Sequence, residues 1–463
     1  MKSLFKKALP AIFAGSALVA GATAFAAEPA TTQDIQTQLQ ELQAKVDQLQ
    51  AQQKQTDQAT VNSVLTDAQK RSQFMADGTD ITSGYDKGFF IQSADKTFTL
   101  KPGVLLQLRN ATTYRQDFKN GGASDDIQNG WEIRRLKLQA SGNAYGPDVT
   151  YYLQLTNNRN AATIELDDIY VQYKFAPHYA IKGGQYKGPF NREELISDAG
   201  QLAVERSLVN EVLGGGATGP RSQGVSFLGG VGGEDYSKDP LHYEIMWNDG
   251  DQTQNTNFQD SSGTTPDTRP DWGAIGRVDY KLMGNWTDYT RFSAKNSKED
   301  LVVVGGGVLA SGNQGANVYR FTADALYQGM EGKLDVFGAA IGQYTDFRNT
   351  AAGAEDTKLD YGAIVQVGYL IDPAWEPFAR ADMVWIDDDF AVAGAGGDNG
   401  FPELTVGVNY YMGKDGAAFN KAKLTLDVSY LPSGSPGDRT GLDELASNGK
   451  NEVVVRAQLQ FAL

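Results

Sequence analysis

The side chains in this 463-residue chain that are best suited to chemistry are cations able to hold an anion. Arg134 and Arg135 are adjacent in the run NGWEIRRLKLQ, and Lys187 and Arg206 follow in two separate blocks. The planar fork of an arginine donates two parallel hydrogen bonds to an oxyanion, which suits phosphate or a carboxylate. In a narrow channel, such fixed cations would replace part of the hydration of a passing anion.

Catalysis and metal binding are poorly supported by the composition. The chain has no cysteine, which excludes a disulfide scaffold and thiolate chemistry. Its 2 histidines make a Ser-His-Asp relay or a histidine metal cluster a poor prediction. It carries 57 acidic against 41 basic residues, so duplex nucleic acid, which demands a basic face, is not an expected partner. We therefore expect no enzyme, no catalytic residue, no cofactor and no metal site.

The elements that must position the cations are β-strands, because the pattern from residue 98 onward has a period of two. In the final run EVVVRAQLQFAL, Val455 and Phe461 lie on one face and Arg456 on the other. About sixteen such segments, each roughly ten residues long, fit before residue 463, and this is the length that an outer-membrane strand requires. An even number of strands also returns both chain ends to the same side.

The connections between these segments alternate between short and long. Short turns are expected at 144–148, 176–177, 283–285, 329–332 and 372–373, and long polar loops at 188–219, 248–271, 298–316, 345–359, 387–400 and 432–450. Glycine runs such as 305–307 are interpreted as loop punctuation. This alternation is typical of an outer-membrane barrel, whose closure satisfies every backbone group within lipid. The predicted fold is all-β: a sixteen-stranded antiparallel transmembrane β-barrel over 98–463, preceded by a linker at 76–97.

Two further segments precede the linker. Residues 1–26 combine three lysines, an apolar run and the sequence Ala24-Phe25-Ala26, which predicts a cleaved secretory signal peptide, with a membrane anchor as the alternative. Its removal takes the formal charge from −16 to −19. Residues 27–75 carry a heptad seam, formed by Ile35, Leu39, Leu42, Val46 and Leu49. We expect a periplasmic, self-associating coiled-coil helix, with a helix lying on its own domain as the alternative.

Strand phase places several charges in the lumen. In the first strand, the phase that points Leu106 and Leu108 toward lipid points Arg109 and Arg115 inward. The second strand changes phase at Arg134-Arg135, and the fourth changes phase at Asp167-Asp168. A β-bulge at each place would turn both neighbouring side chains toward the lumen. An arginine facing lipid at the middle of the membrane would cost about 2–4 kcal/mol, which favours this arrangement.

The insert at 188–219 differs from the other loops because it has helical periodicity. Its apolar face holds Leu195, Ile196, Ala199, Leu202 and Ala203. A partly helical loop with apolar contacts can fold into a barrel and narrow it. We expect an inward-folded constriction loop, with an external cap as the alternative.

A family resemblance rests on residues 129–230. The run NGWEIRRLKLQASGNAYGPDVTYYLQL is followed by IELDDIYVQYKF, GGQYKGPFNREELISD and VERSLVNE, in that order. This succession resembles the phosphate-selective porin family of the O/P type. The resemblance implies a sixteen-stranded homotrimeric channel whose third extracellular loop folds inward. It also implies an anion site formed by Arg134, Arg135, Asp168, Lys187, Arg206 and Ser207. Strand phase or loop position adds Arg109, Arg115 and Arg192.

The expected function is passive diffusion of small anions, such as phosphate or a related oxyanion, through an arginine-lined constriction in the outer membrane. The alternatives are a channel of the same fold for dicarboxylates or sugars, and a structural trimer whose coiled coil ties the membrane to peptidoglycan. The acidic net charge argues against an anion collector unless the loops and the coil hold most of it. Aside from the solute, the expected partners are further copies of the chain and outer-membrane lipid.

Overall fold

The computed structural model describes residues 43–49, 81–86, 88–116, 127–161, 163–215, 220–230, 239–251, 253–255, 272–313, 315–348, 350, 355–390, 399–436, 440–444 and 450–463. The expected signal peptide at 1–26 lies outside the described residues. So does most of the expected coiled coil, of which 43–49 is described as an exposed helical segment. The chain divides into two compact units, 1–79 and 80–463.

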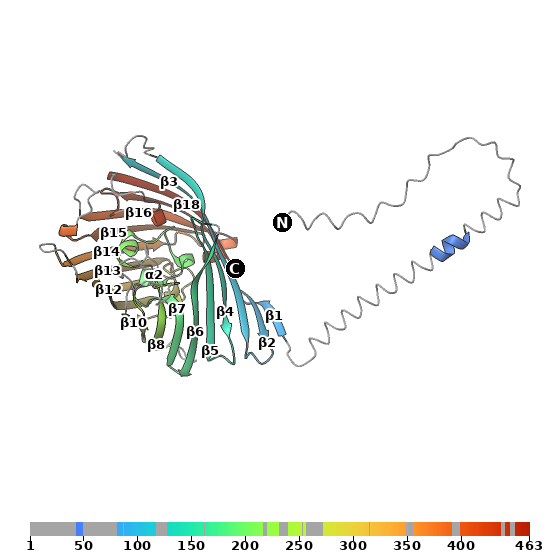
Figure 1. The fold of residues 1–463 in the computed structure, drawn as a ribbon. Coiled ribbons are helices and arrows are strands. Elements are labelled where there is room, and N and C mark those ends of the chain that lie inside the picture. Colours follow the sequence, from blue (N-terminus) through green and yellow to red (C-terminus); the bar gives the residue numbers. More distant parts are fainter. Residues whose placement is uncertain are drawn as a thin grey trace, which may run out of the picture. The chain divides into compact units, whose positions relative to one another are not determined.

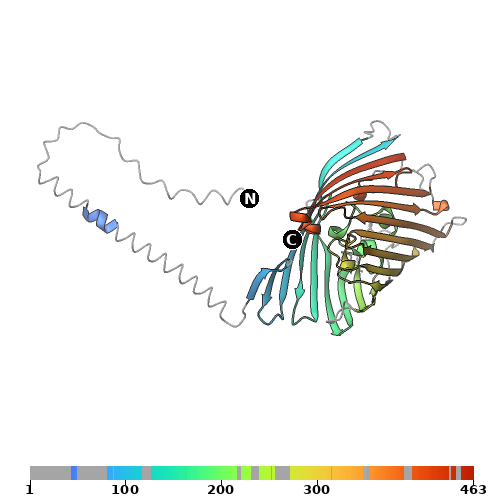
Figure 2. The same ribbon diagram turned by 180° about the vertical axis from the view of Figure 1, so that it is seen from behind.

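Sixteen antiparallel strands form a closed barrel in the second unit (Figures 1 and 2). They are β3 (Thr99–Gln116), β4 (Ile127–Asn143), β5 (Val149–Asn157), β6 (Ile164–Ala176), β7 (Tyr179–Lys187), β8 (Arg221–Gly229), β9 (Leu241–Asn248), β10 (Trp272–Met283), β11 (Leu301–Gly312), β12 (Ala316–Gly329), β13 (Leu334–Phe347), β14 (Thr357–Tyr369), β15 (Trp375–Trp385), β16 (Gly400–Tyr411), β17 (Ala422–Leu431) and β18 (Lys450–Ala462). Each strand pairs with the next, and β18 pairs with β3 with Leu459 opposite Leu108. The predicted fold class is confirmed.

A short hairpin precedes the barrel. Its strands, β1 (Ile81–Tyr85) and β2 (Phe89–Ser93), pair with each other, and Ile91 of β2 lies opposite Leu100 of β3. This hairpin falls within the range that the sequence suggested as a linker, where runs of five residues were too short to stand out as strands.

Helices are short. They are α2 (Arg192–Leu195), η1 (Asp198–Gly200), α3 (Leu208–Leu213), η2 (Asp288–Thr290), η3 (Asp388–Phe390), η4 (Lys414–Gly416), η5 (Phe419–Lys421) and η6 (Thr440–Leu442). None of the helices in the described part of the chain is long and apolar enough to span a membrane.

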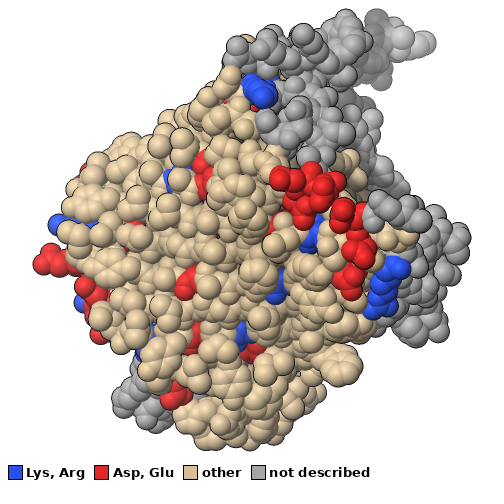
Figure 3. Space-filling model, turned by 90° about the vertical axis from the view of Figure 1, so that its left-hand side faces the viewer, with Lys and Arg blue, Asp and Glu red and all other residues tan. Residues whose placement is uncertain are grey.

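The two faces of the wall have opposite polarity. Outward positions are apolar and exposed, as with Val308 at 63% and Phe321 at 52%, whereas inward positions such as Gln107, Arg109 and Thr405 are polar and buried. Uncharged residues dominate the face shown in Figure 3. A water-soluble barrel would show the reverse pattern, so this arrangement indicates an outer face in lipid.

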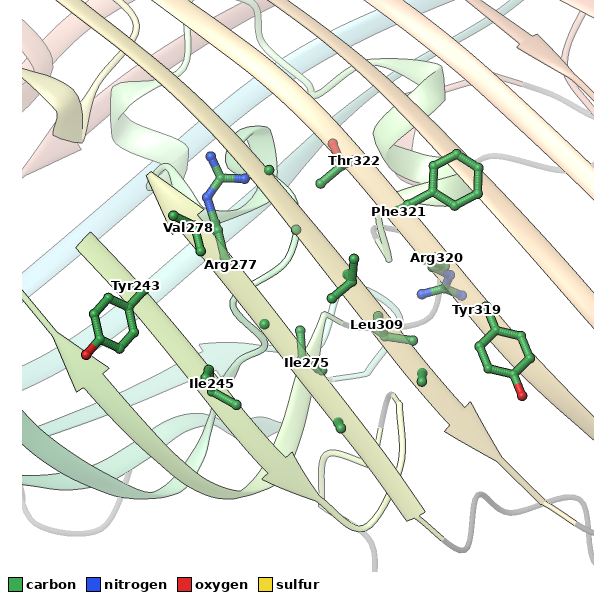
Figure 4. Close-up of a pocket in the computed structure, with 16 residues that line it drawn as sticks. Tyr243, Ile245, Ile275, Arg277, Val278, Leu309, Tyr319, Arg320, Phe321 and Thr322 are labelled. Atoms are coloured by element: carbon green, nitrogen blue, oxygen red, sulfur yellow. The ribbon is translucent and has the colours of Figure 1, made fainter. Parts of the chain in front are cut away.

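A shallow groove of about 840 Å³ runs along the outer face of β9 to β12. Figure 4 shows Tyr243 and Ile245 on one side of it, and Tyr319 and Phe321 on the other. Small residues, among them Ala274 and Gly276, line it. The groove belongs to the lipid-facing surface and does not connect with the lumen cavities described below.

The barrel has a long-loop end and a short-turn end, but the alternation is not strict, and the short turn expected at 283–285 is wrong. The loop expected at 298–316 is wrong, because Leu301–Gly312 forms β11 and only three residues join it to β12. The long connection is instead 284–300, at the short-turn end. The glycine run 305–307 misled the prediction. It is needed within the strand, since a Cβ on Gly307 would lie 2.7 Å from the backbone oxygen of Phe190.

Candidate functional site

Both predicted β-bulges are confirmed by strand register. Along β3 and β4, Gln107 lies opposite Arg135 but Leu108 lies opposite Ile133, so Arg134 is the extra residue. The extra residue in β6 is Asp167, which is skipped between the pairs formed by Asp168 and by Leu166 with β5. As a result, adjacent side chains at each bulge point into the lumen instead of alternating.

Glu205 is the centre of the arginine cluster. This residue of the loop between β7 and β8 accepts hydrogen bonds from Arg109 at 2.5 Å, from Arg134 at 2.6 Å and from Arg135 at 2.7 Å. Arg109 also bonds Glu132 and Asp443. The arginines are therefore brought together as predicted, but they surround a carboxylate of the chain itself.

The environment of Glu205 keeps it charged. Burial favours the neutral acid, but Arg134, Arg135 and Arg109 outweigh burial and hold the pKa of Glu205 well below its usual range. The pKa of Asp198 is likewise well below the usual range, because Lys137 and two arginines outweigh its burial.

A second group of ion pairs joins the same loop to the wall. Asp198 accepts from Lys137 at 2.5 Å and from Arg206 at 2.6 Å. Glu194 pairs with Lys187, the last residue of β7, at 3.0 Å and with Arg206 at 3.2 Å. Lys187 and Arg206, predicted from separate motifs, thus share one partner.

The remaining predicted residues have other surroundings. Ser207 caps α3 by accepting from the Asn210 N–H at 3.1 Å, and its hydroxyl donates to Glu193. Arg192 lies over the ring of Tyr289, 3.5 Å from the ring centre. Arg115 is buried on the inward face of β3, as its phase predicted.

Asp168 forms an ion pair with Arg221, a residue that the sequence did not predict for the site. Arg221, the first residue of β8, donates to Asp168 at 3.0 Å and lies 3.1 Å from Asp167. Its Nε is buried and has no hydrogen-bond partner among the described residues. The site therefore keeps one arginine donor that its own acids do not use.

Two cavities meet at these residues. One, of about 350 Å³, opens toward the long-loop end and includes Arg134, Arg135 and Arg159 in its lining. The other, of about 230 Å³, lies toward the short-turn end and includes Tyr152, Tyr170 and Lys182. The two share Lys137, Lys187, Asp198 and Arg221. This shared ring of three cations and one carboxylate lies where a solute would pass from one cavity to the other.

The charge balance differs between the cavities. The lining of the larger cavity holds seven basic side chains (Arg134, Arg135, Lys137, Arg159, Lys187, Arg206 and Arg221) and six acidic ones (Glu165, Asp167, Glu194, Asp198, Glu205 and Glu211). The smaller cavity holds Lys137, Lys182, Lys187 and Arg221 against Asp168 and Asp198. The cationic excess therefore lies on the short-turn side of the junction, although the whole chain is acidic.

Several of these residues gave no usable signal in the sequence. Lys137 could have been found, because it follows Arg135 in the inward phase of β4. Asp198 and Glu205 lie between α2 and α3, where the helical periodicity expected of the insert gives only the single turn η1, so the expected helical face did not predict their direction. For metal binding, no group of three or more His, Cys, Asp or Glu side chains in the described ranges is arranged to hold an ion.

Comparison with protein families identifies the class. The model of the family "Phosphate-selective porin O and P" matches residues 104–462, which is nearly the whole barrel. The chain belongs to this family. It is an outer-membrane porin, and family and fold together indicate a channel and not an enzyme.

Three solved outer-membrane proteins are similar to the chain at low identity. The anion-selective porin from Comamonas acidovorans has 11% identity and a TM-score of 0.49, covering 79% of this chain and 100% of that one. The channel DcaP of Acinetobacter baumannii has 15% identity and a TM-score of 0.48, covering 81% and 99%. OmpT of Vibrio cholerae, solved in a trimer form, has 11% identity and a TM-score of 0.49, covering 79% and 100%. No curated protein matches the chain.

Proposed function

We propose that this porin passes small anions, phosphate or a related oxyanion among them, through the junction of the two cavities. The observation that carries the proposal is the shared ring of Lys137, Lys187 and Arg221 around Asp198. Fixed cations replace the hydration of an anion, and nearby carboxylates keep the anion from binding too tightly to leave. Arg221 lines both cavities and so places its guanidinium beside the path of such an anion.

The loop between β7 and β8 forms the constriction in this proposal. Its residues contact widely separated parts of the wall, since the Phe190 oxygen accepts from Arg277 of β10 and Glu205 is bonded to Arg109 of β3, seven strands further round. A loop held at both sides of the lumen narrows the path between them.

A trimer with a periplasmic coiled coil completes the proposal. On the outward face of β3 and β4, Asn129 donates to Asn110 at 3.1 Å and to Thr112 at 2.6 Å. Polar side chains are unfavourable against lipid, so this patch supports contact with another subunit. The heptad seam of residues 27–75 supports association of three copies and, at the cell wall, attachment to peptidoglycan.

The nearly balanced charges of the larger cavity favour a second candidate. Seven basic and six acidic side chains would also suit a channel for dicarboxylates or sugars, which need hydrogen bonds more than net charge.

The decisive experiment measures the reversal potential of the purified protein in planar bilayers under a KCl gradient. We expect anion selectivity, block of the chloride current by added phosphate, and loss of both in Arg134→Ala/Arg135→Ala. Cation selectivity, or an unchanged double variant, would contradict the assignment. Selectivity without phosphate block would favour the second candidate.

A further inference from the structure

The connection between β10 and β11, residues 284–300, is not a tight turn. It begins at the short-turn end, yet its aromatic residues Trp286, Tyr289 and Phe292 are at most 5% exposed. They belong to one hydrophobic cluster with Ile196 and Leu202 of the constriction loop. The segment therefore folds into the lumen and meets the constriction loop there.

Two contacts join the two segments directly, and a third holds Tyr289 to β10. The Phe292 N–H donates to the Gly200 oxygen at 3.1 Å. The guanidinium of Arg192 lies 3.5 Å from the ring centre of Tyr289, a cation–π contact in a buried site. The hydroxyl of Tyr289 donates to Asp279 of β10 at 2.9 Å, which fixes the ring.

The segment is itself anchored to the barrel wall. Gln328 of β12 donates to the Phe292 oxygen at 3.1 Å, and Ser293 donates to Glu376 of β15 at 2.8 Å. Lys295 donates to the backbone oxygen of Pro373, in the turn before β15, at 2.5 Å. Because three residues in the middle of the segment bond to the barrel, the segment is anchored along its length as well as at its ends.

The wall on this side of the lumen is closed to water. Glu376, Asn409 and Lys423, on β15 to β17, are between 0% and 2% exposed, although all three point inward. Both cavities that meet at Lys137 and Arg221 lie instead along β4 to β8. The two inward-folded segments thus occupy one half of the barrel and leave the solute path to the other half.

We propose that segment 284–300 positions the constriction loop, with Tyr289 as the positioning residue. Arg192 is the first residue of α2, and Glu194 in the same helix pairs with Lys187 and Arg206 at the edge of the solute path. The ring of Tyr289 holds Arg192, Arg192 holds the start of α2, and α2 places Glu194. A segment at the periplasmic mouth therefore sets the width and charge of the pore.

The first test replaces the ring with an aliphatic side chain. We expect Tyr289→Leu to raise single-channel conductance by roughly twofold and to lower the anion-to-cation permeability ratio. Tyr289→Phe keeps the ring face that Arg192 contacts and loses only the bond to Asp279, so it should stay closer to the wild type than Tyr289→Leu. Arg192→Met should reproduce Tyr289→Leu, and the double variant should add nothing. Wild-type conductance and selectivity in Tyr289→Leu would overturn the proposal.

The second test does not depend on the solute and therefore separates this inference from the proposed function on which it rests. A Cβ on Gly200 would lie 3.4 Å from the Cα of Arg291, and the chain has no other cysteine. We expect Gly200→Cys/Arg291→Cys to form an internal disulfide in outer-membrane vesicles, seen as a reduction-sensitive shift of the denatured band, and each single variant to form none. A double variant that folds, as shown by heat-modifiable migration, but does not cross-link would overturn the inference even if the channel is anion-selective.

Discussion

Arg135 of the barrel wall donates a hydrogen bond to Glu205 of the constriction loop over 2.7 Å. Because Arg109 and Arg134 bond the same carboxylate, one loop residue neutralises much of the arginine cluster. The pore is thus less cationic than its arginines suggest. Under the proposed function, the balance between wall cations and loop anions sets the ion preference of the pore.

Removing the charge of Glu205 should therefore make the channel more anion-selective. In Glu205→Gln, three arginines lose their shared anion, and the reversal potential under a KCl gradient should move further toward the chloride limit. Breaking a buried ion pair costs about 3–5 kcal/mol, so the loop should also become more sensitive to proteases. Asp148→Asn, at an exposed pair with Lys174, is the matched control and should change neither property. A shift toward cations would contradict the assigned role of Glu205.

A single added methyl group should disturb the loop without disturbing the barrel. A Cβ on Gly307 would lie 2.7 Å from the Phe190 oxygen, so Gly307→Ala must displace the start of the constriction loop. We expect a loss of about 1–3 kcal/mol in the free energy of unfolding, measured in urea, and an altered conductance. In the outward-facing control Gly276→Ala, the nearest atom lies 3.9 Å away, and both measurements should match the wild type.

Selectivity should resist mild acid. Burial disfavours the charge of Glu194, but Arg206 and Lys187 outweigh burial and lower its pKa from 4.5 to about 2. A lowered pKa means that the stabilisation is complete above the ordinary value of 4.5 and is lost as the pH falls toward 2. The permeability ratio should therefore stay constant from pH 7 to about 5 and change only below about 4. A transition between pH 5 and 7 would show that another group controls the pore.

Arg221, which the sequence motifs did not single out, should be important for anion affinity. In Arg221→Gln, Asp168 loses its arginine partner, Asp167 keeps only Lys137, and both cavities lose a lining cation. The phosphate concentration that half-blocks the chloride current should rise by roughly tenfold. Lys174→Gln, a partly exposed cation near the short-turn end, should leave the block unchanged.

The sequence predicted those features that depend on local pattern. Alternation along EVVVRAQLQFAL and the other runs indicated the strands, and the change of phase at Arg134-Arg135 indicated a bulge that the register confirms. Both signals follow from the two-residue period of a strand, in which successive side chains point to opposite faces.

The features that the sequence did not predict depend on contacts between distant segments. Segment 284–300 has turn residues and aromatics in an order that indicates neither helix nor strand, so its place in the lumen follows from its contacts with Gly200 and Glu376. Glycines 305–307 were assigned to a loop because their small size signals turns in most chains. Here they make room for Phe190 and for the guanidinium of Arg277.

The partners of the constriction loop also bear on the order of assembly. The Gln201 oxygen accepts from Lys423, and the Val204 N–H donates to Asp427, so these contacts join residues more than 220 positions apart. Closing so long a stretch of chain is entropically costly and slow. The loop can dock only after β17 has been laid down, shortly before β18 closes the seam with β3. A chain cut before Lys423 would thus lack both its closing strand and the anchor that draws the loop inside.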